Sequence, residues 1–434
     1  MLKFPYAIRE FETMISGGYV YMDRTDRIRF IEGWGHELLF LRPRCFAKSL
    51  WLSTLMDYYD VNKADDFERL FGHLAIGQDP TPLHNQYMVM RWDFSKIPTY
   101  GTAEQIKAAY HRYINSEIKN FETSYQRILQ HPIGIHPDDA LDSFYAVLGA
   151  VKASGYQLYL FIDEYDHVAN EVMMDIGDDP KPYDNDLANQ SRQHTRYQRL
   201  VTCENLSKTL LNNLKSANAG EGLERVFMTG ASPALMNGPN SGTNVFDNIS
   251  WFQEMNDLCG FYEHEVANML AGITKEVGIQ AKALEIMRTY YGGSWFTTEV
   301  SPREFRLYNP TMVFYFLHHL QSTGKYPDQM LDHKLKADRG ELAYIAHYPS
   351  GCELLVDILN AEQQISVFEI GTEFRAEEAL QEDIGRGHLA SLLCYLGVLT
   401  IKGRTRDGKI LLTIPNLAMQ KMCAERIQEM VILD

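Results

Sequence analysis

Short apolar runs alternate with helix-spaced apolar positions along the first 260 residues of the chain. Four runs have the length of strands and end in polar or charged residues: 37–41 (ELLFL), 87–95 (YMVMRWDFS), 156–167 (YQLYLFIDEYDH) and 224–233 (ERVFMTGASP). The segments between them place apolar residues three or four positions apart, which predicts helices at about 48–59, 102–153 with a break at 131–137, and 199–216. Strands that alternate with helices are typical of an α/β domain with a mostly parallel sheet flanked by helices.

After residue 260 the pattern changes to successive helices. Residues 387–416 then predict a helix, a strand, a turn that contains Asp-Gly and a second strand, which is the order of a winged-helix module, and a last helix follows at about 416–430. Residues 172–197 are polar and rich in turn-forming residues, which predicts a long inserted loop. The chain is therefore divided into an α/β domain (1–260), a helical domain (261–365) and a winged-helix-like C-terminal module (366–434).

The stretch FLRPRCFAKSLWLSTL, from Phe40 to Leu55, connects the first predicted strand to a helix. A Lys-Ser pair at such a junction is typical of a phosphate-binding loop, where backbone N–H groups and a helix N-terminus surround anionic oxygens. The lysine adds a positive charge at the phosphates, and the hydroxyl binds Mg²⁺. Lys48 and Ser49 fit the usual spacing, but Arg42 and Ala47 stand where its two glycines are expected. Because Lys-Ser often begins an ordinary helix, this loop alone is a weak signal.

A second motif supports the first. The run LYLFIDEYD is an apolar strand that ends in Asp163 and Glu164. In a Walker B strand the aspartate holds Mg²⁺ and the adjacent glutamate orients and deprotonates the attacking water. Thr229 ends a third apolar strand, where its hydroxyl is placed to contact a γ-phosphate. Since ligands of parallel sheets bind at the carboxyl ends of the strands, the three segments predict one nucleotide site.

Composition and charge restrict the function further. The formal net charge is −16, which argues against a broad basic face for duplex DNA. The 6 cysteines show no CxxC spacing, as expected for a reducing compartment without a zinc site. No apolar run reaches the roughly 18 residues that span a bilayer, and the first residues do not form a secretory signal. We therefore expect a cytoplasmic protein without membrane contact.

Taken in order, these blocks resemble the prokaryotic AAA-ATPase-like domain family, whose members are often fused to a PD-(D/E)XK nuclease domain. The phosphate loop and the block IDEYD are the specific matches, and GGYVYMDRTDRIRFIE, VMRWDFS, MTGASP and LYNPTMVFYFL extend the resemblance over most of the chain. A nuclease domain is not evident, because the triplet Glu117-Ile118-Lys119 lies in a predicted helix. The resemblance also makes a role in bacterial defence an expectation.

The resemblance implies ATP and Mg²⁺ as ligands. It assigns Ser49 and Asp163 to the metal and Glu164 and Thr229 to catalysis. The residues that it assigns to the nucleotide lie in the loop and its helix: Arg42, Arg44, Phe46, Ala47, Lys48, Ser49 and Leu50. Cys45 and Ala47 depart from the family pattern, which has an arginine and a glycine there.

Two functions follow from these residues. The first is an AAA-like ATPase that binds Mg-ATP and couples its nucleotide state to the helical C-terminal half and to a partner, with activity weakened by Ala47. The alternative is a pseudo-ATPase scaffold that does not hydrolyse ATP and that binds a protein, such as a nuclease or effector, or nucleic acid. The intact set Lys48, Asp163 and Glu164 favours the first function, and the changes at Cys45 and Ala47 favour the second. The oligomeric state is open.

Overall fold

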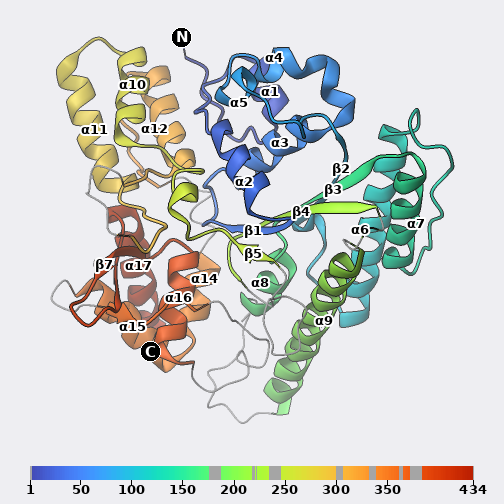
Figure 1. Cartoon of the computed structure of the whole chain (residues 1–434). Helices are drawn as coiled ribbons and strands as arrows, with labels where there is room; N and C mark the ends of the chain where they lie inside the picture. The colour runs from blue at the N-terminus through green and yellow to red at the C-terminus, as the bar shows by residue number, and fades with distance from the viewer. Residues whose placement is uncertain are drawn as a thin grey trace.

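The computed structural model describes residues 2–174, 187–217, 220, 222–233, 246–299, 306–331, 339–360, 365–371 and 384–433. Its centre is a parallel sheet of five strands in the order β2-β3-β4-β1-β5 (Figure 1). The strands are β1 (Glu37–Leu41), β2 (Tyr87–Asp93), β3 (Gln157–Asp163), β4 (Leu223–Gly230) and β5 (Asp247–Asn248). The predicted α/β class with a mostly parallel sheet is confirmed.

Alternating side chains of β1 separate two hydrophobic cores. Leu38 and Phe40 belong to one core, and Leu39 and Leu41 belong to the other. Because successive side chains of a strand point to opposite faces, a strand with apolar residues at every position must be covered on both sides. Two helical layers provide that cover.

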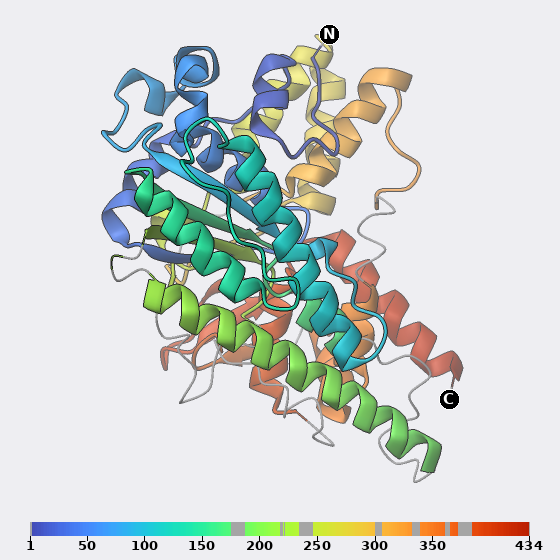
Figure 2. The ribbon, with the colours of Figure 1, turned by 90° about the vertical axis from the view of Figure 1, so that its right-hand side faces the viewer.

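The layer on the Leu38 and Phe40 face is built around α3, which contacts β2, β3 and β4. Its members are α1 (Phe11–Ser16), α2 (Ile28–Trp34), α3 (Lys48–Tyr59), α4 (Phe67–Phe71) and α5 (Ala75–Gln78). On the opposite face α6, α7 and α9 run side by side (Figure 2). That layer consists of α6 (Ala103–Ser124), α7 (Ala140–Ala153), α8 (His167–Met174) and α9 (Leu187–Ala217).

Part of the predicted inserted loop is helical instead. Residues 172–174 belong to α8 and residues 187–197 to α9, while 175–186 lie outside the described residues. Polar composition led to the loop prediction, but α9 packs on α6 through buried apolar side chains further along the same helix, including Leu200, Leu210 and Leu214. Tertiary packing thus stabilises a helix whose first turns are polar.

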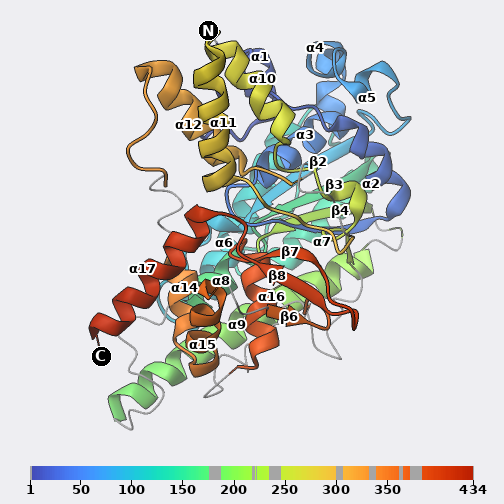
Figure 3. The same ribbon diagram turned by 90° about the vertical axis from the view of Figure 1, so that its left-hand side faces the viewer.

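The chain after residue 260 forms a helical region and a C-terminal module (Figure 3). The helical region contains α10 (Glu263–Ile273), α11 (Val277–Tyr291) and α12 (Pro310–Thr323). The module is a three-stranded antiparallel sheet with helices, in which α16, β7 and β8 follow the predicted winged-helix order. Its elements are α14 (Arg339–Ala346), α15 (Pro349–Leu359), β6 (Ile365–Val367), α16 (Arg386–Tyr395), β7 (Thr400–Arg404), β8 (Ile410–Thr413) and α17 (Leu417–Leu433).

In the part of the chain that the structure describes, no helix combines the length and the apolar character needed to cross a bilayer.

The C-terminal module lies directly against the loop between β1 and α3. Gly397 approaches Pro43 so closely that a Cβ on the glycine would come within 2.8 Å of the proline ring, and Trp251 donates a hydrogen bond of 3.1 Å to the Tyr395 hydroxyl. Most of α16 is buried, including Leu389, Leu392 and Leu393. The helix that precedes the hairpin is therefore used for packing within the protein.

This contact predicts an unequal response to alanine at two glycines of the module. Gly397 and Gly408 both have positive φ, so alanine at either should lower the free energy of unfolding by about 1–2 kcal/mol. Gly397→Ala should lower it by about 1 kcal/mol more, because only its Cβ meets Pro43, whereas Gly408 has open space around it. Urea denaturation of both variants measures the difference, and equal losses would contradict the close packing.

Candidate functional site

The carboxyl ends of three neighbouring strands bring together the residues that the sequence motifs single out. In the register of the sheet Phe40 of β1 pairs with Thr229 of β4, and Ile162 of β3 pairs with Met228. Lys48 begins α3, six residues after the loop leaves β1 at Arg42. Lys48, Asp163 and Thr229 therefore meet at one edge of the sheet, as the positions of the motifs predict.

The loop takes left-handed backbone conformations without glycine. Cys45 has φ 65° and Ala47 has φ 64°, and Glu164, directly after β3, has φ 51°. A left-handed conformation costs a residue with a Cβ about 1–2 kcal/mol, so the surrounding structure must hold the loop. One such contact is the Thr311 hydroxyl of α12, which donates a hydrogen bond of 2.9 Å to the carbonyl of Cys45.

Lys48 is buried beside an acid. Its side chain is 3% exposed, and its Nζ lies 3.5 Å from Oε1 of Glu164 and 3.4 Å from the carbonyl of Pro43. Burial by itself lowers the pKa of Lys48, but Glu164, Asp166 and Asp163 around it raise the pKa above its ordinary value. The ammonium is thus held in its charged form at the first turn of α3.

Asp163 is almost completely buried, with a side chain 1% exposed. Its Oδ1 accepts a hydrogen bond of 2.7 Å from the Thr229 hydroxyl. Burial alone raises the pKa of Asp163, but the Arg91 guanidinium and the hydroxyl donors outweigh it and lower the pKa below its usual range. The carboxylate is therefore ionised.

Arg91 is a site residue that the sequence motifs did not indicate. It projects from β2, where it pairs in register with Phe161 of β3, and its Nη2 lies 2.8 Å from Oδ2 of Asp163. Its Nη1 lies 3.1 Å from Oε1 of Glu10, which precedes α1. The only sequence signal was an arginine within an otherwise apolar strand.

Asp166, three residues after Asp163, has a structural role. It is buried and accepts hydrogen bonds from the backbone N–H groups of Ala231 and Ser232 and from the Asn170 side chain. These bonds attach the start of α8 to the chain that leaves β4. They fix the position of the segment that carries Asp163 and Glu164.

A polar cavity opens beside Lys48. Its space of about 820 Å³, which includes the open mouth, is lined by the first turn of α3, by Glu164, by the start of α12 and by residues 5–9. We call residues 5–9 the strap. Hydrogen bonds from Gln321 of α12 to the Leu2 carbonyl and from Phe11 N–H to Ser53 of α3 attach the chain on either side of the strap to different parts of the protein. Arg9 of the strap lines the cavity and has no ion-pair partner among the described residues.

A second, apolar cavity of about 510 Å³ adjoins the first. Both are lined by Pro5, Met14, Ala47, Leu50, Pro310 and Phe314. The apolar cavity continues to Tyr21, Trp51 and Phe261. The two cavities together offer one polar, cationic end and one apolar end.

Four of the loop residues assigned to the nucleotide line the polar cavity, namely Ala47, Lys48, Ser49 and Leu50. The structure gives the other three different surroundings. Arg42 is buried and donates hydrogen bonds to the carbonyls of Leu41, Ser250 and Met255. Phe46 packs edge-on against Phe296 at a centroid distance of 5.2 Å.

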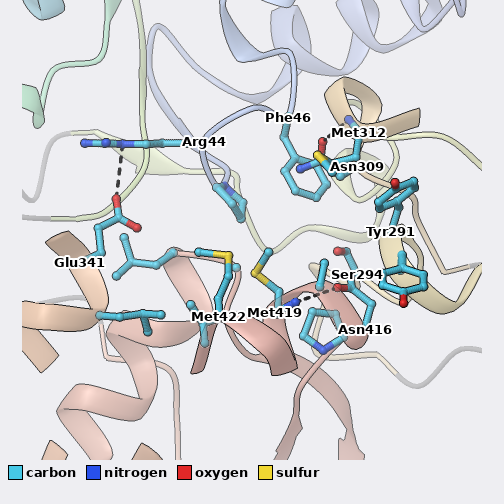
Figure 4. Close-up of a pocket in the computed structure, with 18 residues that line it drawn as sticks. Arg44, Phe46, Tyr291, Ser294, Asn309, Met312, Glu341, Asn416, Met419 and Met422 are labelled. Atoms are coloured by element: carbon cyan, nitrogen blue, oxygen red, sulfur yellow. Dashed lines mark hydrogen bonds and ion pairs between the residues drawn. The ribbon is translucent and has the colours of Figure 1, made fainter. Parts of the chain in front are cut away.

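Arg44 points away from the polar cavity, toward the C-terminal module. Its Nε lies 3.3 Å from Oε1 of Glu341 in α14, and its Nη2 lies 3.1 Å from Oε1 of Glu171 in α8. Figure 4 shows Arg44 and Glu341 at a third cavity, which we call the junction cavity. In this cavity Phe46 and Met312 face Met419 and Met422 of α17. The loop thus has the polar cavity on one side and the C-terminal module on the other.

The donors at this edge fit a small divalent cation. No group of three or more His, Cys, Asp or Glu side chains that could hold a metal occurs in the described ranges. The Asp163 carboxylate and the Ser49 hydroxyl, which helps to lower the pKa of Asp163, offer hard oxygen donors of the kind that Mg²⁺ prefers. Mg²⁺ commonly takes only one or two protein ligands and completes its shell with water and phosphate oxygens.

A parallel sheet with a lysine-bearing loop after β1 and an acidic pair after β3 defines the P-loop NTPase class of fold. The model of a family described as "Predicted AAA-ATPase" matches residues 5–238. The chain belongs to this family, as the motifs indicated.

Several solved structures resemble the chain. One is Cdc6p from Pyrobaculum aerophilum, with 11% identity, a TM-score of 0.34, and coverage of 96% of this chain and 98% of that one. Another is the Aeropyrum pernix Orc1 protein in complex with DNA, with 8% identity, a TM-score of 0.32 and coverage of 93% of each chain. A comparison with curated proteins found no match.

The conformation of Ala47 predicts that glycine stabilises the protein at this position. Ala47→Gly removes the cost of the left-handed conformation, but it also raises the conformational entropy of the unfolded chain. Because the first effect is larger, the free energy of unfolding should rise by about 0.5–1 kcal/mol. The matched control is Ala108→Gly on the exposed face of α6, which should lower it by about 1 kcal/mol. Chemical denaturation measures both, and a loss of stability in Ala47→Gly would show that the loop is not left-handed there.

Proposed function

We propose that the protein is an ATPase that binds Mg-ATP across the two adjoining cavities. The observation that carries this proposal is the pair of the buried Lys48 with the partly exposed Glu164 at the mouth of a polar cavity, beside the ionised Asp163. The phosphates would lie in the polar cavity against the first turn of α3, where Ala47 provides no side-chain cap for the backbone N–H groups. The base would lie in the apolar cavity near Trp51.

Each residue then has a separate task. Lys48 exchanges Glu164 for phosphate oxygens, since a polyanion is a stronger partner for its ammonium than a single carboxylate. Ser49 and Asp163 would hold Mg²⁺, which when bound would neutralise phosphate charge. Arg9 of the strap supplies a second cation to the polar cavity. Thr229 keeps the Asp163 carboxylate in its orientation through the bond at 2.7 Å.

The release of Glu164 from Lys48 is the step that prepares hydrolysis. In the absence of nucleotide its carboxylate is 22% exposed and paired with Lys48. Once phosphate takes the lysine, Glu164 is free to accept a proton from the attacking water at the edge of the same cavity. The pairing therefore keeps the catalytic base inactive until nucleotide arrives.

The far side of the loop provides a route from nucleotide to the C-terminal half. Pro43 lies against Gly397, Arg44 pairs with Glu341, and Thr311 holds the Cys45 carbonyl. A shift of the loop on phosphate binding would therefore change its contacts with α12, α14 and the module. A protein partner that contacts the module would sense the nucleotide state in this way.

Binding depends on the loop lysine in this proposal. Calorimetry of the full chain should show Mg-ATP binding, and Lys48→Ala should weaken it at least about a hundredfold through the loss of a buried charge on the phosphates. The matched control is Lys63→Ala, which removes a lysine paired with Glu12 away from the cavities and should leave the affinity unchanged. No heat at millimolar Mg-ATP, or equal affinities in wild type and Lys48→Ala, would contradict the proposal and favour the scaffold function.

A substitution at Glu164 should lower the rate of hydrolysis without lowering the affinity for Mg-ATP. Glu164→Gln keeps the shape of the side chain but cannot accept the proton, so turnover should fall by about 10²–10⁴-fold. Affinity for Mg-ATP should be kept or improved, because the variant no longer competes for Lys48. Phosphate release assays and calorimetry on the same preparation give the two values. Unchanged turnover would remove Glu164 from the catalytic assignment.

A further inference from the structure

Arg91 divides its charge between two carboxylates from different parts of the chain. One N–H group reaches Asp163 at 2.8 Å and another reaches Glu10 at 3.1 Å, so neither contact is bidentate. An arginine that serves as a permanent counter-ion usually engages one carboxylate with two parallel bonds. Arg91 is instead able to lose one partner and keep the other.

The exposure of the side chain sets Arg91 apart from a static ion pair. The Arg91 side chain is 19% exposed, whereas that of Asp163 is 1% exposed, so the arginine has room to move while the aspartate is fixed.

A cation that binds the Asp163 carboxylate would displace the Arg91 guanidinium from it. Both oxygens of the carboxylate are occupied, Oδ1 by Thr229 and Oδ2 by Arg91. A divalent cation that approaches Ser49 and Asp163 competes with the guanidinium for Oδ2 and repels it. Glu10, which is 60% exposed, offers the displaced guanidinium a carboxylate that it already touches.

Glu10 also connects Arg91 to the strap. It follows Arg9 directly and precedes α1, and its Oε2 accepts a hydrogen bond of 3.2 Å from Ser53 of α3. A guanidinium that moves from Asp163 toward Glu10 therefore acts on the end of the segment that lines the polar cavity.

We propose that Arg91 is a positioning residue that holds the Asp163 carboxylate until the metal arrives and so sets the affinity of the site for a divalent cation. With a divalent cation bound at Ser49 and Asp163, Arg91 would leave Asp163 and keep Glu10, which would hold the strap more firmly. This inference rests on the proposed Mg-ATP site and goes beyond it, since it assigns the control of metal affinity to a residue on β2.

The test is Mn²⁺ binding to the full chain saturated with a non-hydrolysable ATP analogue, followed by electron paramagnetic resonance of free Mn²⁺. Arg91→Gln removes the competing charge and should tighten Mn²⁺ binding roughly tenfold or more, given the size of charge interactions at such distances. Arg91→Lys keeps the charge and should restore an affinity near that of wild type. Glu10→Gln removes the alternative partner and should weaken Mn²⁺ binding roughly threefold.

The matched control is Arg225→Gln, a buried arginine of β4 whose guanidinium binds the carbonyls of Gly35 and Glu32. It should lose stability but keep the Mn²⁺ affinity, which separates a structural role from metal control. Unchanged or weaker Mn²⁺ binding in Arg91→Gln would overturn the inference. If that variant does not fold, Glu10→Gln is the deciding test. An Mn²⁺ affinity of Glu10→Gln equal to that of wild type would overturn the inference.

The inference and the proposed function fail in different ways. Analogue binding that is abolished in Lys48→Ala, combined with Mn²⁺ affinities that do not respond to Arg91 or Glu10, defeats only the inference. A wild-type chain that binds no analogue defeats both.

Discussion

The structure depends on the mutual neutralisation of charges buried at the carboxyl edge of the sheet. Lys48 and Asp163 are almost fully buried, and a charge in such a position is unfavourable unless it is paired. Lys48 pairs with Glu164, and Asp163 with Arg91. The charges at this edge are thus balanced without ligand. Under the proposed function, a ligand of phosphates and metal would exchange these partners, and a ligand that carries both an anion and a cation would be favoured.

The same edge explains how a loop without glycine keeps its shape. Cys45 and Ala47 both have positive φ, a conformation that costs each of them free energy. Contacts from outside the loop offset that cost, since Arg42 ties its start to the carbonyls of Ser250 and Met255 and Thr311 holds Cys45. Because these contacts come from regions that follow the sheet in sequence, the phosphate loop and the C-terminal half are parts of one packed unit.

Much of the fold was predictable because apolar runs specify strands directly. The runs that begin at Glu37 and Tyr87 matched β1 and β2 almost to the residue. The positions of Lys48, Ser49 and Asp163 at the carboxyl edge of the sheet were predictable because each lies at or shortly after the end of a strand. The contact of Arg91 was not, since its link to Asp163 spans 72 positions, and neither was the position of the strap along the polar cavity. The first turns of α9 were missed because distant packing, rather than composition, stabilises them.

The most direct test of this account is a crystal structure of the chain with Mn²⁺ and a non-hydrolysable ATP analogue, with the metal located by anomalous scattering. The account predicts an anomalous peak between Ser49 and Asp163, phosphates on Lys48, and Glu164 separated from the lysine. Analogue bound elsewhere, or crystals in which Lys48 remains paired with Glu164 at saturating analogue, would contradict it.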